Sequence, residues 1–468
     1  MVCAKLGLLG SGVVGEAIQD ILFQRAPEIA ARTGVELQIK KIYTRHPESK
    51  KWHKTYPDLF TRSAEEVIDH SDVDIIIEVL GAHDRSELSA YKDYIMRAFE
   101  NGRDVVTSDK AVLAWFGNVI WPAALKKDRE LRFEACVGGG IPIIRSLAES
   151  FSAEEPEAIF GIINGTCNFI LSAMKKENKS FAEALAQAQR LGYAETNPSA
   201  DTSGLDAEAK LILLAAVAFG VHVQPGVIFR KGIEEIQAID FLYAGRRGLC
   251  TIKHLATARR ANDQIEALAA PFLVPQDHLV GTVDGPTNAV FLNGNRSAGR
   301  INDSPGADKS GGRDWNYAFI GPGSGGGPTA VAVLGDVCDL ARGRKHPLPR
   351  PAAENSRGLA FQPEDQIQAC FYLRFIVRDR PGIVGEICQV FGMEGINVAE
   401  IWQLSHSADE LQQLAQSYGL ATDRSLILPF VITLEQTTVG KIKHALQIIR
   451  TRDFNLADPV WMPIWKNP

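Results

Sequence analysis

A glycine-rich turn near the start of the chain constrains the fold more than any other feature of the sequence. An apolar segment, residues 5–9, runs directly into Gly10-Ser11-Gly12-Val13-Val14-Gly15, and a helical pattern follows over residues 16–31. Glycines at these spacings allow a tight strand-to-helix turn and a close approach of the backbone to a pyrophosphate. The free amides at the start of the helix attract an anion. We therefore expect a dinucleotide at Gly10, Gly12, Val13, Val14 and Gly15, and a purely structural turn is the alternative.

Strands and helices alternate along the first 145 residues. Further apolar runs at residues 37–44, 73–80 and 104–107 are typical of strands, and helical patterns separate them. This alternation predicts an α/β fold with a parallel sheet covered on both faces, so we expect a Rossmann-type domain over residues 1–145. A second glycine-rich loop, residues 321–327, opens a helix, and we expect residues 318–342 to complete this domain.

The rest of the chain divides into a middle domain and a separate end. Residues 146–317 mix longer helices with alternating strand patterns, which predicts an α+β domain. Residues 343–365 are polar and rich in proline, as expected of an interdomain linker. Strands and helices alternate again from 366 to 468, so we expect a third unit whose removal leaves the first two intact.

Composition and charge bear on the partners and the location to expect for this chain. The chain has 468 residues, 45% of them hydrophobic, and a net charge of −6. This mild acidic excess gives no reason to expect nucleic acid or a membrane surface as a partner. No apolar run approaches the ~20 residues that cross a bilayer. Seven scattered cysteines without a CxxC pair, and a start without signal-peptide features, favour a cytoplasmic location.

The end of the second expected strand bears on the choice of cofactor. It reads Tyr43-Thr44-Arg45-His46, with no acidic residue at the tip. An acid at this place binds the ribose 2′-hydroxyl of NAD, whereas an arginine accommodates the 2′-phosphate of NADP. We therefore expect NADP, bound through Arg45, with NAD as the alternative. A solvated basic turn would also explain these residues.

Asp206 and Lys210 are the strongest catalytic candidates. They lie four positions apart and so share one face of a helix. A surface ion pair is the ordinary explanation of such spacing. However, residues 211–217 are apolar all round, which predicts a buried helix, and a lysine leading into it is well placed for proton transfer.

Five segments in order resemble the motifs of one enzyme family. Residues 188–210 resemble the signature of homoserine dehydrogenases, and 107–111 match its Thr-Ala-Asn-Lys-Ala at three of five places. The other three segments are 134–144, 161–170 and 321–329. The resemblance covers the first 342 residues. It implies reversible, NAD(P)-dependent interconversion of L-homoserine and L-aspartate 4-semialdehyde, in the biosynthesis of threonine, methionine and isoleucine.

The resemblance also implies roles for individual residues. Lys210 would be the general acid and base, Lys110 a second active-site lysine, and Asp206 would hold the substrate and position Lys210. Glu195 would bind the substrate ammonium, since a buried ammonium requires a counter-charge. The substrate would also meet Gly165 and Thr166, and the cofactor would also meet Thr107, Lys110, Gly192 and Gly323. Residues 146–317 would form the catalytic and dimerisation domain of a homodimer or homotetramer.

The same family carries a monovalent-cation site that this sequence matches. Glu134, with the backbone carbonyls of Val137, Gly139 and Ile141, would hold an ion such as Na+, because oxygen ligands suit a hard cation. A glycine-rich turn without an ion is the alternative. The chain departs from the family at Asp109, where asparagine is usual. An acid there would stabilise a protonated Lys110 and disfavour cofactor phosphates.

The C-terminal unit resembles an ACT domain, a βαββαβ amino-acid-sensing module. The resemblance rests on Asp379-Arg380-Pro381-Gly382, which joins a strand to a helix, and on Gly395-Ile396-Asn397-Val398. It implies an amino-acid effector, with threonine favoured, and a purely structural role is the alternative. Two other functions stay open for the whole chain: another amino-acid dehydrogenase, or a catalytically silent amino-acid-binding regulator.

Overall fold

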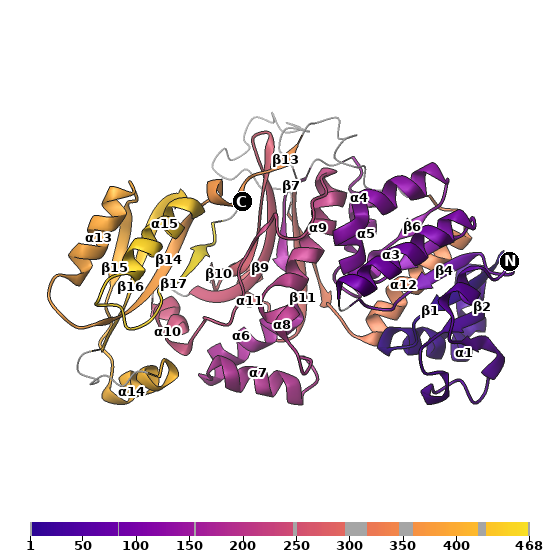
Figure 1. Ribbon diagram of the computed structural model, residues 1–468, viewed down its shortest axis with the longest axis horizontal. Helices are drawn as coiled ribbons and strands as arrows, with labels where there is room; N and C mark the ends of the chain where they lie inside the picture. Colours follow the sequence, from indigo (N-terminus) through magenta and orange to yellow (C-terminus); the bar gives the residue numbers. More distant parts are fainter. Residues whose placement is uncertain are drawn as a thin grey trace, which may run out of the picture.

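The protein is an elongated molecule of three parts in a row (Figure 1). The computed structural model describes residues 2–82, 84–153, 156–246, 250–294, 316–345, 359–419 and 427–466. An N-terminal domain lies at one end and the C-terminal unit at the other (Figure 1). Two long strands, β9 (Cys250–Ala261) and β10 (Gln264–Pro275), lie between them.

The N-terminal domain is built on a six-stranded parallel sheet of order β3-β2-β1-β4-β5-β6. Leu6, Leu8 and Leu9 of the central strand β1 are all fully buried, as expected of a parallel strand covered on both faces. The Rossmann-type fold expected from the sequence is confirmed. Its elements are β1 (Val2–Leu9), α1 (Val13–Thr33), β2 (Val35–Tyr43), β3 (Phe60–Thr61), α2 (Ala64–Ile68), β4 (Ile75–Glu78), α3 (Arg85–Glu100), β5 (Asp104–Thr107), α4 (Lys110–Lys126) and β6 (Leu131–Arg132).

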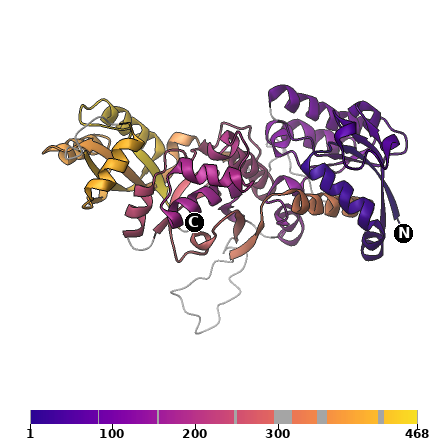
Figure 2. The same ribbon diagram turned by 90° about the horizontal axis from the view of Figure 1, so that it is seen from below.

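Helix α12 (Gly326–Ala341) returns the chain to this domain after the middle domain has been formed. It lies beside α1 (Figure 2). Val333 and Val337 of α12 share an apolar core with Ile18 and Leu22 of α1. The glycine-rich loop before α12 therefore joins the middle domain to the N-terminal one.

The middle domain is an antiparallel sheet of order β12-β11-β7-β9-β10, with helices packed on it. Helix α9 (Leu205–Phe219) is buried from Leu211 to Ala216, as its apolar sequence predicts. The remaining elements are α5 (Ile143–Arg145), β7 (Pro156–Ile162), α6 (Gly165–Glu177), α7 (Phe181–Arg190), α8 (Ser199–Thr202), β8 (Phe229–Arg230), α10 (Ala238–Arg246), α11 (Leu279–Thr282), β11 (Thr287–Gly294) and β12 (Asn316–Pro322).

The C-terminal unit has the element order βαββαβ, with one extra helix, α14, in the segment between its second and third strands. Its antiparallel strands lie in the order β17-β14-β16-β15. The elements are β14 (Gln368–Arg378), α13 (Ile383–Met393), β15 (Val398–Trp402), α14 (Ala408–Ser417), β16 (Ile427–Thr438), α15 (Val439–Arg450) and β17 (Val460–Ile464).

The C-terminal unit and the middle domain share one continuous sheet. Strand β17 pairs with β10, where Ile464 lies opposite Leu273. Strand β13 (Ala360–Phe361), at the end of the expected linker, also pairs with β10. Residues 346–358 of that linker lie outside the described residues. The unit is therefore joined to the middle domain by strand pairing as well as by the chain.

A buried ion pair reinforces this junction. Arg374 of β14 and Asp240 of α10 have fully buried side chains, and Arg374 Nε lies 3.1 Å from Asp240 Oδ1. Tyr372 donates a hydrogen bond of 2.8 Å to the same oxygen, and Arg374 donates another of 3.0 Å to Gln237. A buried charge left without its partner is strongly destabilising, so the two sides of the junction are coupled.

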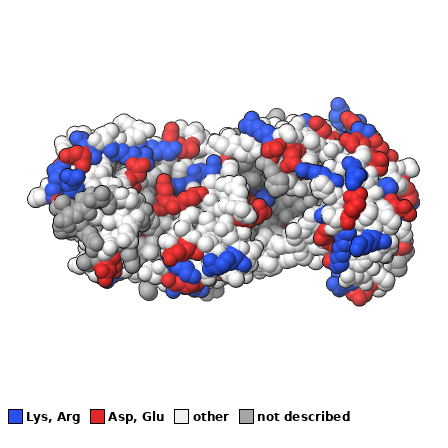
Figure 3. All heavy atoms as spheres, turned by 60° about the horizontal axis from the view of Figure 1, so that its bottom comes forward, with Lys and Arg blue, Asp and Glu red and all other residues white. Residues whose placement is uncertain are grey.

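The surface carries mixed charge. On the face shown in Figure 3, lysines and arginines are interspersed with aspartates and glutamates along the whole length of the molecule. This face therefore offers no extended field of one sign to steer a ligand. Among the helices that the structure describes, none combines the length and the apolar character needed to span a bilayer.

Candidate active site

Two lysines from different domains converge on the carboxylate of Asp206. Asp206 lies in the first turn of α9, and Lys210 Nζ, one turn later, lies 2.7 Å from its Oδ2. Lys110 begins α4 of the N-terminal domain, and its Nζ lies 3.3 Å from Asp206 Oδ1. Lys210 also donates a hydrogen bond of 2.8 Å to the carbonyl of Ile163. The structure thus brings together the three residues predicted to be catalytic.

The charges in this cluster stabilise one another. Burial alone would raise the pKa of Asp206, but Lys210 and Lys110 together lower it well below its ordinary range. In turn, the charge of Asp206 raises the pKa of Lys110 above its usual value, although burial opposes this. A carboxylate between two ammonium groups leaves a net positive charge, which suits an oxygen atom that gains negative charge during a reaction.

Asn164 is a functional candidate that the sequence reasoning missed. Its Nδ2 donates hydrogen bonds of 2.9 Å to Asp206 Oδ2 and 2.7 Å to Asp201 Oδ1. Its Oδ1 accepts a hydrogen bond from the amide of Cys167 and so caps α6. An asparagine directly before a helix is a recognisable N-cap signal, and the cap fixes the amide against Asp206.

Of the residues expected at the substrate, Gly165 and Thr166 lie at the start of α6, Asp206 lies in the first turn of α9, and Glu195 lies apart from them. Gly165 is the first residue of α6, and a side chain there would meet the carbonyl of Pro286 at 2.7 Å. Thr166 donates a hydrogen bond of 2.7 Å to the carbonyl of Tyr193. The carboxylate of Glu195 is exposed and forms no hydrogen bond or ion pair within the described parts of the chain, so it is not linked to the Asp206 cluster.

The glycine turn has the shape that a dinucleotide requires. Gly10 has φ +113°, and a Cβ there would lie 2.7 Å from the carbonyl of Val79. A Cβ on Gly15 would lie 2.2 Å from the carbonyl of Gly10, whereas one on Gly12 would meet nothing within 4 Å. Gly12 therefore faces open space next to the uncapped start of α1, where Val13 is 77% exposed and Val14 is half-buried. This cradle fits a pyrophosphate.

Arg45 lies just beyond the end of β2 and is paired. Its Nη2 lies 2.6 Å from Glu87 Oε1 and 3.3 Å from the hydroxyl of Tyr91. The hydrogen bond to Glu87 raises the pKa of Arg45 above its usual value. The Arg45 side chain is 63% exposed, so a ligand can reach it.

The Thr107 side chain forms its hydrogen bond within the protein. It is fully buried, and its hydroxyl donates a hydrogen bond of 2.5 Å to Glu78 Oε2. Burial, with the neighbouring Asp109 charge, raises the pKa of Glu78 to about 8. The other two predicted cofactor residues are glycines in loops: Gly192, with φ +77°, and Gly323, before α12.

Asp109, the position at which the sequence departs from the family that it resembles, caps α4. Its Oδ1 accepts hydrogen bonds from the amides of Ala111 (3.0 Å) and Val112 (3.2 Å), and its Oδ2 accepts one of 2.7 Å from the amide of Ala82. Asparagine has one acceptor oxygen, whereas aspartate has two. The acid therefore ties the segment after β4 to the start of α4, which carries Lys110.

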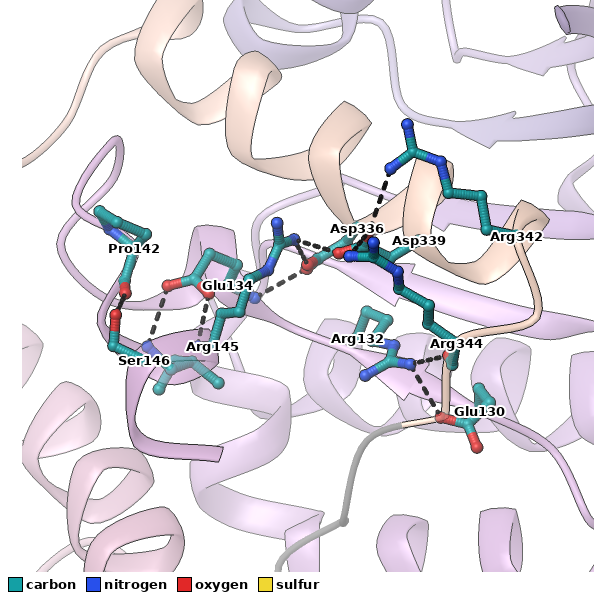
Figure 4. A network of polar contacts seen from close by, with 11 residues as sticks. Glu130, Arg132, Glu134, Pro142, Arg145, Ser146, Asp336, Asp339, Arg342 and Arg344 are labelled. Carbon is teal, nitrogen blue, oxygen red and sulfur yellow. Dashed lines mark hydrogen bonds and ion pairs between the residues drawn. The ribbon is translucent and has the colours of Figure 1, made fainter. Parts of the chain in front are cut away.

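The expected cation loop is part of a polar network (Figure 4). The two carboxylate oxygens of Glu134 accept hydrogen bonds from the amides of Ile144 (2.9 Å) and Arg145 (2.7 Å). Burial, with nearby Asp336, raises the pKa of Glu134 to about 7. Arg145 also pairs with Asp336 at 2.9 Å and Asp339 at 3.0 Å, which ties α5 to α12.

Backbone carbonyls would have to supply most ligands of a cation in this loop. Gly138 and Gly139 of this loop have positive φ values of 73° and 55°. The carbonyl of Ile141 already accepts a hydrogen bond from the backbone amide of Ile143. In the part of the chain that the structure describes, no three His, Cys, Asp or Glu side chains are grouped as metal ligands. The carboxyl group of Glu134 is the one side-chain oxygen ligand among the four predicted residues.

The family models and the relatives that match this chain carry the same description. A family model described as homoserine dehydrogenase matches residues 142–338, and one described as homoserine dehydrogenase, NAD binding domain, matches residues 10–134. A homoserine dehydrogenase of Pseudomonas aeruginosa is 34% identical over 409 residues, which cover 85% of this chain and 88% of the relative. One of Neisseria gonorrhoeae is 35% identical over 406 residues, with the same coverage.

Solved structures agree with these relatives. A homoserine dehydrogenase from Thiobacillus denitrificans superimposes with a TM-score of 0.80 at 31% identity, covering 99% of this chain and 98% of the other. The match therefore includes the C-terminal unit. A hyperthermophilic archaeal homoserine dehydrogenase in complex with NADPH has a TM-score of 0.58 at 24% identity, covering 74% of this chain and 100% of the other, and it shares the fold.

Proposed function

This chain belongs to the homoserine dehydrogenase family of oxidoreductases, and from that premise we propose that it interconverts L-aspartate 4-semialdehyde and L-homoserine with NADP(H). The observation that carries the proposal is the position of Asp206 between Lys210 and Lys110. The two lysines come from the two domains between which a dinucleotide and a substrate would meet. The site can therefore form only when both domains are in place.

In the proposed reaction the protein handles the proton. A bound nicotinamide would donate or accept the hydride at C4 of the substrate. In the reducing direction, Lys210 gives a proton to the carbonyl oxygen as the oxygen becomes a hydroxyl, and in the oxidising direction it removes that proton. Lys110, which Asp206 keeps protonated, stabilises negative charge on the same oxygen. Asp206 holds both ammonium groups in place.

The substrate amino acid needs a counter-charge for its ammonium group. Glu195 is proposed for this role because its carboxylate is exposed and free to pair with an incoming cation. Gly165 and Thr166, at the start of α6, would lie beside the substrate. Asn164 would then act on the substrate indirectly, through its hydrogen bond to Asp206.

NADP is the proposed cofactor. The cradle at Gly10, Gly12 and Gly15 fits a pyrophosphate, and Arg45 lies at the end of β2, where the 2′-phosphate of NADP would bind. The NADPH complex of the archaeal protein with the same fold supports a nicotinamide nucleotide. A monovalent cation such as Na+ is proposed at Glu134, Val137, Gly139 and Ile141, where oxygen ligands would hold it.

The C-terminal unit is proposed to be an ACT domain that senses an amino acid, with threonine as the first candidate. Its βαββαβ element order supports this proposal. An effector acts only through different affinities for two states, so the signal would pass through the sheet shared with the middle domain, or through a homodimer or homotetramer.

One assay tests the proposed function against its alternatives. NADPH oxidation by the purified protein is followed with L-aspartate 4-semialdehyde, and in parallel with NADH and with other aldehydes. Rapid turnover confined to the semialdehyde supports the proposal. Turnover of a different aldehyde would indicate another dehydrogenase. A protein that binds NADPH or threonine but turns over nothing would instead be a silent regulator.

A further inference from the structure

Asn288 has a buried amide group without a hydrogen-bond partner. It lies near the start of β11 and is 1% exposed, and neither its Oδ1 nor its Nδ2 has a partner. Among the described residues, no other side chain has two buried polar atoms unpartnered in this way. Buried polar groups are nearly always paired, and an unpaired one destabilises the state that contains it.

Another buried asparagine nearby shows the ordinary situation. Asn168 of α6 is also 1% exposed. Its Nδ2 donates hydrogen bonds to the carbonyls of Val283 (3.1 Å) and Thr287 (3.3 Å), and its Oδ1 accepts one of 3.3 Å from Lys253. Burial of an asparagine in this domain is therefore compatible with full pairing, and the unpaired amide of Asn288 requires a separate explanation.

The amide of Asn288 lies against the two loops that approach the proposed ligands. A Cβ on Gly323, in the loop before α12, would lie 1.9 Å from Asn288 Cγ. A Cβ on Gly165, at the start of α6, would lie 3.4 Å from Asn288 Oδ1. A side chain at position 323 would displace this amide. Asn288 thus lies between the loop 321–325 and the proposed substrate side of the site.

The loop 321–325 also reaches the proposed cofactor side. It leads into α12, and a Cβ on Gly326 would lie 2.9 Å from the carbonyl of Val13 in the glycine turn. Three of its five residues are glycine, and Gly325 has φ +108°. Gly321 and Pro322 end β12 and pair with Asn288 and Thr287 of β11, so the freedom that glycine gives the backbone is confined to residues 323–325 of this segment. The segment therefore packs against the glycine turn on the proposed cofactor side and, through Asn288, lies close to the start of α6 on the proposed substrate side.

We propose that Asn288 is a positioning residue for the loop 321–325 in the nicotinamide complex. Its amide gains one donor and one acceptor partner from the loop backbone when the loop settles on the nicotinamide half of NADP(H). The inference rests on the proposed function. Because the hydrogen bonds exist in the bound state alone, they contribute to cofactor affinity and not to the stability of the free protein.

The test compares two asparagine-to-leucine variants, since leucine has nearly the shape of asparagine without its polar atoms. Asn288→Leu is expected to leave the Tm of the free protein unchanged or higher, and to raise the Kd for NADPH roughly tenfold, as expected for one or two lost hydrogen bonds. Its Kd for 2′-phosphoadenosine diphosphate, which lacks the nicotinamide half, is expected to stay the same. Asn168→Leu is the matched control and is expected to lower the Tm. A second variant, Asn288→Ala, is expected to raise the Kd for NADPH as Asn288→Leu does.

Three results would contradict the inference or the proposed function, and they can be told apart. A lower Tm for Asn288→Leu with an unchanged Kd for NADPH would show that the amide stabilises the free protein, and the inference would be wrong. An equal loss of affinity for NADPH and for the adenine probe would also overturn it, because the effect would not be confined to the nicotinamide half. A wild-type protein that neither binds NADPH nor reduces the semialdehyde would overturn the proposed function instead.

Discussion

Lys110 and Asp206 form an ion pair of 3.3 Å that joins the N-terminal domain to the middle domain. The lysine begins α4 and the aspartate lies in the first turn of α9, so the contact links two helix starts from different folding units. Because Asp206 also holds Lys210, any relative movement of the two domains changes the charge around the proposed proton carrier. The contact therefore couples domain position to the chemistry of the site.

Replacing Lys210 with alanine is expected to abolish turnover while cofactor binding stays nearly intact. General acid–base groups supply roughly 10²–10⁴-fold in rate, so the loss is expected in kcat. Steady-state kinetics and a fluorescence titration with NADPH separate the two effects. Lys345→Ala is a suitable control, because Lys345 forms an exposed ion pair with Asp128. A Lys210 variant with more than about a tenth of the activity would exclude Lys210 as the proton carrier.

Cofactor preference is expected to depend on Arg45. A charge-assisted hydrogen bond to the 2′-phosphate is worth about ten- to a hundredfold in affinity, so Arg45→Ala is expected to raise the KM for NADPH by that factor and to leave the KM for NADH almost unchanged. Arg62→Ala is the matched control, because Arg62 forms a similar exposed pair with Glu48 at 2.7 Å. If the Arg45 variant lost both cofactors equally, the residue would serve only to hold Glu87.

The arrangement around these residues shows which parts of the site a sequence can predict. The pairing of Asp206 with Lys210 followed from their spacing on one helix, and the glycine turn followed from a local motif. The contact of Lys110 with Asp206 spans 96 positions of sequence, so no local pattern encodes it. The resemblance to a family placed Lys110 in the site, but only the fold shows its partner.

Contacts between residues far apart in the sequence account for the other features that the sequence did not predict. The pairing of Arg45 with Glu87 depends on α3 packing near the end of β2, which charge patterns do not reveal. The polar, proline-rich composition of residues 343–365 predicted a linker, yet the strand pairing of β13 and β17 with β10 depends on residues that lie about a hundred or more positions away. Composition describes the local chain and says little about such long-range pairs.

Stability is expected to fall as the pH rises toward neutrality, in part because of Glu78. Burial raises its folded-state pKa from the ordinary 4.5 to about 8. Between these two values the folded state binds more protons than the unfolded state, so the free energy of unfolding decreases as the pH increases. Urea denaturation at about pH 5 and about pH 8 measures this loss.

Glu78→Gln removes the titrating group and is expected to reduce the loss of stability across this window. The amide keeps one acceptor for the backbone amide of Leu80, which now hydrogen-bonds to Glu78 Oε1 at 2.8 Å. Glu48→Gln, at an exposed position, is the control and is expected to leave the pH dependence unchanged. An identical pH dependence in wild type and in Glu78→Gln would show that Glu78 is ionised in the folded protein throughout the range.

Deletion of residues 343–468 is expected to unfold the middle domain, although the sequence alone suggested a separable unit. The deleted segment contains Trp465, whose ring centroid lies 4.7 Å from that of Phe160 and 5.7 Å from that of Phe272. These three side chains are at most 7% exposed and belong to one apolar core that spans the junction. Deletion would expose this core, and it would also leave Asp240 without Arg374.

The soluble yield and the circular dichroism spectrum of the truncated chain measure this directly. Trp465→Ala in the full chain isolates the contribution of the junction and is expected to destabilise the protein by about 3–5 kcal/mol. Met393→Ala, at a position 72% exposed, is the control with little expected effect. A truncated chain that is soluble, folded and as active as the full protein would show that the shared sheet is dispensable, and the C-terminal unit would then be a separable regulatory module.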